Sequence, residues 1–319
     1  MMLIDSVHEL ARGVVIMLCL MILAAILRKT GVLSKEDSGL TSKLVLKVTL
    51  PALIFSSLAN HKIETDILLV SAIVTLSELV CIALAYIIAR LLKFTRPETG
   101  ALMLVSGFGM STMLGYPLIQ EAFPGNLIAM EDAIITSELG VGLLLFIAGP
   151  IIAMYFGREK VEGKQILISV KQFITSPIFI SILAGIIISF INIPAKNEVV
   201  ITISKILKLI GNANLLLVAT TIGLLIETRS IKSYIVFLIF AVILKLVAQP
   251  LITFYFTDMI DIEVIARQVA FIETAMPSAI LVAIFAREYD CKPELVSTTT
   301  LVTLIISLIS VTIFFGVLF

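Results

Sequence analysis

Five polar side chains of this sequence fall inside long apolar stretches, where they can take part in ion or substrate chemistry. They are Glu78, Glu138, Lys245, Gln249 and Glu273. A charged side chain at the middle of a bilayer costs about 2.5–3.5 kcal/mol on insertion scales, so each one is a candidate functional group. We predict that these five residues, together with Thr274, couple the protein to a cation. That cation is a proton or a sodium ion, with Glu138 and Glu273 as the sodium ligands.

Glu78 and Lys245 also have a structural alternative. The two side chains can form a buried ion pair that fixes how their helices pack without touching a ligand. No further cofactor is expected, because the three cysteines are far apart and the two histidines lie in short polar stretches. Histidine-based metal chemistry is therefore disfavoured.

Two of the apolar stretches are interrupted by glycine or proline, at 107–117 and 273–278. A helix that stops inside the membrane leaves unpaired N–H groups and the positive end of its dipole, which can hold a carboxylate. For each proline the alternative is a simple kink. We predict that a small organic anion contacts the following residues of the two interruptions: Met110, Ser111, Thr112, Gly115, Tyr116, Pro117, Ala275, Pro277 and Ser278.

Phosphate-binding loops are missing from these glycine-containing stretches. The spacing of Gly107, Gly109 and Thr112 does not fit G-x-G-x-x-G, and no G-x-x-x-x-G-K-[ST] occurs. An ATP-driven pump is therefore disfavoured. The absence of a G-x-S-x-G motif likewise disfavours an enzyme.

Four lysines lie near the predicted starts of their apolar stretches: Lys43, Lys47, Lys205 and Lys208. Long basic side chains in a first helical turn usually extend to the membrane interface, and we expect this of all four. Lys205 and Lys208 can also attract anions from outside.

The elements that must position these residues are predicted to be transmembrane helices. Of the 319 residues, 59% are hydrophobic and 14% are charged, against about 25% charged in soluble domains. Lys+Arg and Asp+Glu balance at 23 each, so no basic field attracts nucleic acid. A bilayer span needs about 20 apolar residues, and ten stretches meet or approach this length. They run over 12–27, 38–58, 66–92, 98–122, 132–156, 166–191, 199–226, 231–256, 264–286 and 295–319.

The two interrupted stretches are the fourth and the ninth, five apart. Because five is odd, the second half must have the opposite topology to the first, and paired interrupted spans are a pointer to a transporter binding site. The chain is thus predicted to be an all-α integral membrane protein with ten transmembrane helices. They form two inverted five-helix repeats, 1–157 and 158–319, in which helices 4 and 9 are broken.

The basic residues predict the orientation of these helices. One set of loops holds Arg28, Lys29, Lys35, Arg90, Lys93, Arg96, Arg158, Lys160, Lys164, Arg229, Lys232, Arg287 and Lys292. The opposite loops hold Lys62, Lys196 and Arg267. Since basic loops stay in the cytoplasm, we expect a multi-pass protein of the cell membrane with both termini outside.

Five pieces of the chain resemble the auxin efflux carrier family of permeases, which includes plant auxin exporters and bacterial carriers proposed for malate or malonate. The pieces are LVLKVTLPALIF at 44–55, GYPL at 115–118, Ser176–Pro177, IGLL at 222–225 and AMPSAILVAIFAREYDCKPELVSTT at 275–299. The resemblance covers nearly the whole chain, and the last piece is specific.

The resemblance implies a scaffold of helices 1, 2, 6 and 7 and a mobile transport domain of helices 3–5 and 8–10. It also implies that helices 4 and 9 cross at their prolines and that substrate binds against the crossing, with Ser176 nearby. Plant relatives suggest a homodimer by analogy. The chain differs from many members at Met110, where they have asparagine, and from plant members at Glu138 and Glu273, where they often have glutamine.

The expected function is alternating-access transport of small organic anions such as malate, malonate or auxin-like acids. The coupling is to protons or sodium, and the protein's partners are the anion and the lipid bilayer. One alternative is a sodium symporter of the bile-acid type, which shares the crossed-helix architecture. A second alternative is a membrane sensor that binds a ligand without moving it.

The predicted orientation is tested by cysteine labelling in intact cells. Lys196→Cys is expected to react with an impermeant reagent added outside, and Lys160→Cys is expected to stay unmodified until the cells are opened. Labelling of position 160 but not of position 196 in intact cells shows that the topology is reversed.

Overall fold

The computed structural model describes residues 2–59, 65–157, 167–168, 171, 174–191, 198–225, 234–260 and 262–319. The first half contains α1 (Met2–Lys29), α2 (Asp37–Leu44), η1 (Val45–Thr49), α3 (Leu50–Leu58), α4 (Thr65–Leu91), α5 (Arg96–Gly107), η2 (Ser111–Gly115), α6 (Tyr116–Ala122), α7 (Leu127–Ile135), η3 (Thr136–Gly142) and α8 (Leu143–Gly157). The second half contains α10 (Pro177–Ile191), α11 (Glu198–Asn212), α12 (Asn214–Leu225), α13 (Ile235–Val242), η5 (Ile243–Ala248), α14 (Gln249–Asp258), α15 (Val264–Thr274), α16 (Ile280–Glu288) and α17 (Pro293–Leu318). The η elements are π-helical turns.

Within the described residues, seven helical runs are long and apolar enough to cross a membrane. They are Val7–Lys29, Asp37–Leu58, Asp66–Leu91, Leu127–Gly157, Thr202–Leu224, Ile235–Asp258 and Pro293–Leu318. Three predicted helices are missing from this set. The fourth and the ninth are each interrupted, so neither half is long enough alone. Of the sixth, the longest described helix is α10 (Pro177–Ile191), which is shorter than a full span. The predictions of an all-helical fold and of a membrane protein are confirmed, whereas ten helices and the inverted repeats remain predictions.

Large apolar side chains cover the outside of the bundle, as expected of surfaces that face lipid. Leu79, Ile87 and Ile309 are exposed, for example. Hydroxyl side chains lie inside, where they bond to carbonyl oxygens of their own helix, as Thr299 does by donating to Leu295 O at 2.8 Å. Such local bonds satisfy polar groups that have no water to bind.

The interruption of the fourth predicted helix lies at 108–110, directly after α5. Phe108 is extended, with φ −101° and ψ 128°, and the chain re-enters a helix at Ser111. The ninth is interrupted between α15 and α16, where Ala279 is extended with φ −63° and ψ 140°. Met110 N–H donates to Pro277 O at 2.7 Å, and Ala279 N–H donates to Phe108 O at 3.0 Å. The two interruptions, 108–110 and 277–279, thus pair as a short antiparallel bridge, which we call the crossover.

The expectation that both helices cross at their prolines is wrong for Pro117. Pro117 lies at the start of α6, which continues directly from η2, seven residues after the crossover begins to pair at Met110. Pro51 and Pro250 likewise follow η1 and η5 at the second position of the next helix. The wider π-turn makes room for a proline ring that would otherwise clash with the preceding turn. Prolines of this kind stay inside continuous helices.

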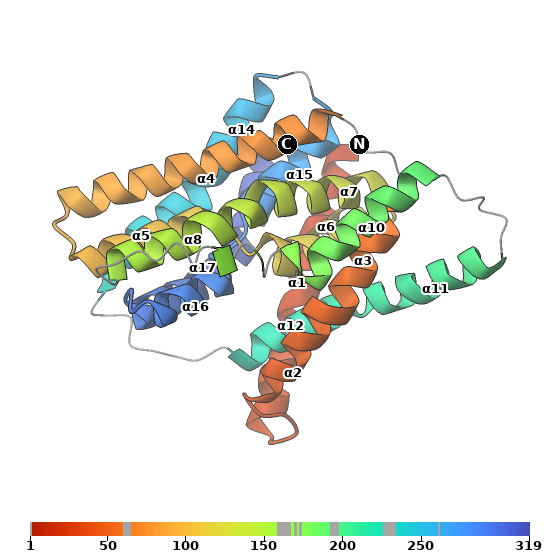
Figure 1. Ribbon diagram of the computed structural model, residues 1–319, viewed down its shortest axis with the longest axis horizontal. Helices are drawn as coiled ribbons and strands as arrows, with labels where there is room; N and C mark the ends of the chain where they lie inside the picture. The colour runs from red at the N-terminus through yellow and green to blue at the C-terminus, as the bar shows by residue number, and fades with distance from the viewer. Residues whose placement is uncertain are drawn as a thin grey trace.

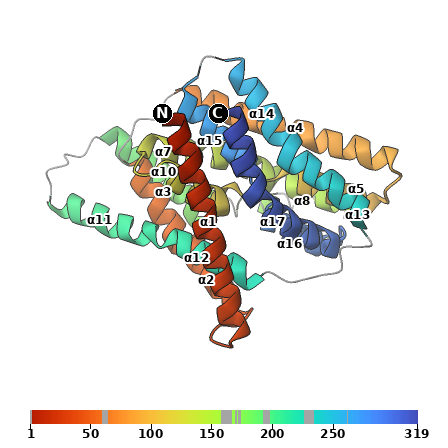
Figure 2. The same ribbon diagram turned by 180° about the vertical axis from the view of Figure 1, so that it is seen from behind.

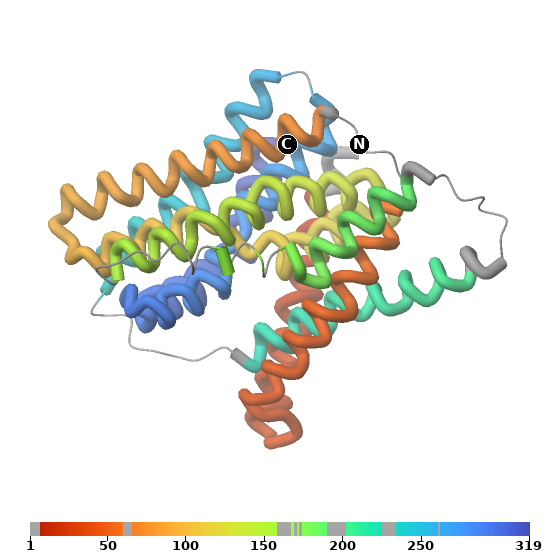
Figure 3. Tube along the Cα trace, viewed as in Figure 1, coloured from red at the N-terminus to blue at the C-terminus, as the bar shows by residue number. Residues whose placement is uncertain are grey.

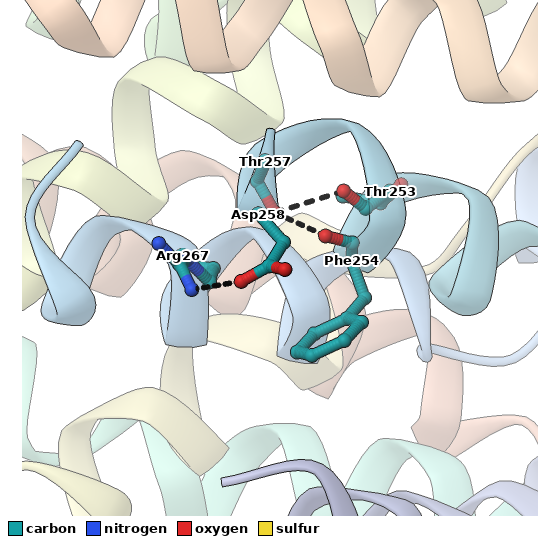
Figure 4. Close-up of polar contacts among 5 residues, drawn as sticks. All are labelled: Thr253, Phe254, Thr257, Asp258 and Arg267. Atoms are coloured by element: carbon teal, nitrogen blue, oxygen red, sulfur yellow. Dashed lines mark hydrogen bonds and ion pairs between the residues drawn. The ribbon is translucent and has the colours of Figure 1, made fainter. Parts of the chain in front are cut away.

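An ion pair, shown in Figure 4, joins the last residue of α14 to the first turn of α15. Arg267 Nη1 lies 2.5 Å from Asp258 Oδ1, and Thr257 in the same turn donates to Thr253 O and Phe254 O. Because the Asp258 side chain is 57% exposed, the pair contributes little stability. It neutralises an arginine that was predicted to lie in a loop poor in basic residues.

The helices divide into two sides in Figures 1 and 2, with α1, α2, α3, α10, α11 and α12 on one side and α4, α5, α8 and α16 on the other. On the first side, α12 packs against α1 and α2, and α10 and α11 pack against α3. On the second side, α5 packs against α4 and α8. α17 packs against α1 near the ends of the chain, where the Cβ position of Gly316 lies 3.3 Å from Val7 Cγ1 (the trace of both helices is shown in Figure 3).

The membrane side on which these ends lie is not fixed by the arrangement, so the orientation stays a prediction. Several basic residues on which it depends lie outside the described part of the chain: Lys62, Arg158, Lys160, Lys164, Lys196, Arg229 and Lys232. The boundary predicted between the two repeats, at 157/158, is followed directly by residues outside the described part of the chain.

α1 and α12 approach each other closely at Gly223, so we expect the fold to require a glycine at this position. A Cβ at Gly223 would overlap the backbone oxygen of Met21 and lie 2.8 Å from Ala24 Cβ. Gly223→Ala is therefore expected to cost about 1–3 kcal/mol of stability, measured by thermal unfolding in detergent. Gly39→Ala is the control, because nothing lies within 4 Å of its Cβ position. Equal unfolding temperatures for both variants would show that the contact is not tight.

Candidate functional site

Glu138 lies on the π-turn η3 and faces the beginning of η2. Its Oε1 accepts hydrogen bonds from Thr112 Oγ1 at 2.8 Å and from the Tyr116 hydroxyl at 2.9 Å. Beside it, Ser137 Oγ donates to Ser111 Oγ at 2.6 Å. The residues following the crossover are thus held to η3 by a network of hydroxyls around one carboxyl group.

Lys245 is fully buried on the π-turn η5, behind the crossover. Its ammonium donates to Gln249 Oε1 and, at 3.3 Å, to Thr274 O, while Gln249 Nε2 donates to Gly107 O at 3.3 Å. A Cβ at Gly109 would lie 2.9 Å from Lys245 Nζ, so the backbone of the crossover passes directly over the ammonium. Lys245 and Gln249 therefore satisfy carbonyl groups that the two interrupted helices leave open.

Glu78 and Glu273 are both fully buried and interact electrostatically with Lys245. Among the described residues, the Glu273 oxygens have no hydrogen-bonding partner, and Glu78 has only the nearby Gln249 amide, which makes no bond of full geometry. The Glu273 oxygens lie against the backbone at Gly115, where a Cβ would come within 2.7 Å of Oε1. Glu273 also interacts with the charge of Glu138. The region beside the crossover thus holds three acids and one ammonium, and two of the acids have oxygens free to bind a proton or a cation.

A cavity of about 560 Å³ opens beside the crossover. Its walls come from α2 and η1, the residues 109–113, η3 and the start of α8, the residues 176–178, α12, and the start of α16. Leu46, Leu145, Phe146 and Ile284 make much of this lining apolar, and Lys47 and Glu138 add charged groups. A cavity of this size and character is typical of a small-molecule site.

The structure separates the sequence-predicted substrate residues into two groups. Four of them line the cavity: Met110, Ser111, Thr112 and Ser176. Six do not, and they are Gly115, Tyr116, Pro117, Ala275, Pro277 and Ser278. Some of these six hold the site together instead, since Ser278 Oγ donates to Val105 O at 2.6 Å and Pro277 O accepts from Met110. Contact with substrate stays a prediction for all ten.

The predicted coupling residues lie close to one another, on both sides of the crossover. Glu138 lines the cavity, whereas Lys245, Gln249 and the carbonyl of Thr274 form the buried network behind it. The predicted Glu78–Lys245 pair interacts through its charges, and the Gln249 amide also lies near the Glu78 carboxyl group. Ion coupling by any of these groups stays a prediction.

Sequence reasoning missed several residues that line the cavity, above all Lys47. The expected position of Lys47 in a first helical turn is wrong, because it lies ten residues after Asp37 and eleven before Leu58 in the span Asp37–Leu58. Ser38, Ser42 and Thr221 were also missed. A lysine this deep in an apolar stretch was an available signal, but the uncertain start of the helix concealed it.

The paired interruptions, the apolar outer surface and the cavity beside the crossover are those of a multi-pass helical membrane protein with a cavity inside the bundle. The family described as "Membrane transport protein" matches residues 10–315, and the chain belongs to this family. The resemblance to auxin efflux carriers is confirmed by this match.

Two similar proteins come from methanogenic archaea, and both are described as uncharacterized transporters. One, from Methanocaldococcus jannaschii, is 24% identical over 300 residues, which cover 93% of this chain and 94% of that protein. The other, from Methanothermobacter thermautotrophicus, is 26% identical over 295 residues, covering 92% and 93%. The similarity therefore extends over the whole region that builds the cavity and the crossover.

The charge interaction behind the crossover is tested by a double-mutant cycle. Lys245→Met is expected to cost about 3–5 kcal/mol, because it leaves Gln249 and the Thr274 carbonyl without a donor. Adding Glu78→Gln is expected to cost less than the sum of the two single changes. Thermal unfolding of purified protein measures both, with Lys205→Met on exposed α11 as the control. Additive losses show that Glu78 and Lys245 act independently.

Proposed function

We propose that this protein is a secondary transporter that carries small organic anions across the cell membrane by alternating access. The observation that carries the proposal is the cavity beside the crossover, which is lined by the beginnings of two half-helices. Ser111 starts the run η2–α6, Ile280 starts α16, and both residues line the cavity. Half-helix N-termini that point into a site at membrane depth bind the anionic groups of substrates in other transporter folds.

The charge at these helix starts supports an anion rather than a cation as substrate. A helix N-terminus presents unpaired N–H groups and about half a positive charge. The hydroxyls of Ser111 and Ser176 lie in the same cavity and can donate further hydrogen bonds, because each is an acceptor in its contact within the protein. These donors leave a carboxylate satisfied where water is scarce.

The position of the cavity supports alternating access. Its lining comes from α2, η1 and α12 on one side of the molecule and from the crossover, η3, α8 and α16 on the other. We propose that α1–α3 and α10–α12 form the scaffold and that the remaining helices form the transport domain. Movement of one side against the other then opens the cavity to each side of the membrane in turn.

Coupling to a cation is proposed at Glu273, with Glu138 and Glu78 nearby. A buried carboxyl group without a hydrogen-bonding partner is costly in its charged form, so it binds a proton or a sodium ion readily. The Glu273 oxygens lie against Gly115, within the same helix run that begins at the cavity. Binding of a cation at Glu273 can move η2 and α6, and this movement can change the side of the membrane to which the cavity is open.

Uptake into proteoliposomes tests the proposal. The panel holds labelled phenylacetate, hexanoate, malate and malonate, each measured with and without a proton or sodium gradient. At least one of these anions is expected to accumulate in response to a gradient. Uptake of a sterol acid with sodium and of none of the four favours the bile-acid type of symporter. Binding without uptake favours a sensor.

The proposed coupling role predicts the behaviour of Glu273→Gln. The variant preserves shape but removes the ionisable group, so it is expected to bind substrate and allow downhill exchange while losing gradient-driven accumulation. Glu294→Gln, at the exposed start of α17, is the control and is expected to accumulate substrate normally. Should Glu273→Gln accumulate substrate with unchanged pH and sodium dependence, coupling must lie at Glu138 or Glu78.

A further inference from the structure

Lys47 lies at a depth where a lysine is costly. It sits on the π-turn η1 in the middle of the span Asp37–Leu58, and the helical backbone is continuous through α2, η1 and α3. A charged side chain at the centre of a membrane helix costs about 2.5–3.5 kcal/mol on insertion scales and marks a functional site by default. The side chain lines the cavity.

No partner for the ammonium is present among the described residues. Lys47 is exposed and makes no hydrogen bond or ion pair with them. Glu138 lies in the same cavity, but its Oε1 already accepts from Thr112 and Tyr116. Lys245, the other lysine near the crossover, is in contrast fully engaged by Gln249 and the Thr274 carbonyl. Lys47 therefore carries a charge that is left for a ligand to satisfy.

The other residues that line the cavity indicate what the rest of the ligand must be like. Apart from Lys47, the described lining residues include no other lysine or arginine, and Leu46, Met113, Val141 and Phe146 form apolar walls. One ammonium can pair with one carboxylate. A second carboxylate on the same ligand would lie against apolar side chains or near Glu138, where its lost hydration is not replaced.

We infer that Lys47 pairs with the single carboxylate of an organic anion whose body is apolar, and that this pairing sets substrate affinity and selectivity. The inference rests on the proposed function and narrows its substrate class. It places the carboxylate between η1 and the half-helix starts, with the apolar body toward the apolar walls. A monocarboxylate of this kind is then preferred over malate or malonate.

Three variants test the inference. Lys47→Met removes the charge at similar length, Lys47→Arg keeps the charge, and Lys43→Met removes a lysine of the same span that does not line the cavity. The readouts are the KM for uptake of labelled phenylacetate and the shift in unfolding temperature that phenylacetate causes in purified protein. A hydrogen bond to a charged group contributes about 1.5–3 kcal/mol, so Lys47→Met is expected to raise KM by about 10- to 100-fold. Lys47→Arg is expected to restore most of the affinity, and Lys43→Met to behave as wild type.

Position 47 is also probed without transport. Lys47→Cys, in a Cys19→Ser background, is expected to react with a water-soluble anionic thiosulfonate, and phenylacetate is expected to slow the reaction. An unreactive cysteine shows that position 47 does not face the cavity and overturns the inference even if Lys47→Met fails to fold.

Each remaining outcome separates the inference from the proposed function. If wild-type protein transports phenylacetate and Lys47→Met does so with unchanged KM, the inference is wrong and the proposed function stands. If malate or malonate is preferred over phenylacetate, the single-carboxylate part is wrong. If wild-type protein neither binds nor moves any anion of the panel, the proposed function fails and the inference fails with it.

Discussion

Backbone hydrogen bonding inside the membrane is the constraint on which the site depends. Lipid offers no donor or acceptor to an open backbone group, so a helix can stop at this depth only where protein completes its bonds. The chain meets this requirement by pairing its two interruptions, with Met110 bonded to Pro277 and Ala279 bonded to Phe108. Each interruption is stable because the other is present. Two half-helix starts are thereby exposed to one cavity.

Side chains behind the crossover also complete backbone hydrogen bonds of the interrupted helices. Lys245 and Gln249 bond to carbonyl groups at Thr274 and Gly107, which belong to the two interrupted helices. Only glycine at 109 leaves room for the ammonium, since a Cβ would lie 2.9 Å from it. The site is thus backed by a buried cation, and its acids lie at different distances from water. Glu138 reaches the cavity, whereas Glu78 and Glu273 are enclosed.

Proline has two distinct roles in this fold. Pro277 has no N–H to continue a helix, and its carbonyl accepts one of the two crossover bonds. Pro117, Pro51 and Pro250 instead follow π-turns and leave their helices continuous. The π-turns also aim residues into the bundle, because η1 carries Lys47, η3 carries Glu138 and η5 carries Lys245. A local widening of the helix therefore accompanies most of the charged groups around the site.

The sequence by itself determined the membrane environment, the helical class and the family. Lipid excludes most charged residues from whole helices, so the apolar stretches and the polar residues inside them can be read one stretch at a time. The interruption of the fourth and ninth stretches, and the position of Glu138, Lys245 and Glu273 inside apolar stretches, were predictable for the same reason. Ten spans and the inverted repeats follow from counting and remain predictions.

The tertiary structure alone decided where the helices cross and what lines the cavity. Proline composition could not distinguish Pro277 at the crossover from Pro117 in a continuous helix, because the difference depends on which carbonyl is available as a partner. Nor could it place Lys47 in the same cavity as the start of α16, since the two lie more than 200 residues apart in the chain. Local patterns show which side chains lie within an apolar stretch. Which of these side chains face each other is decided by packing between helices distant in sequence.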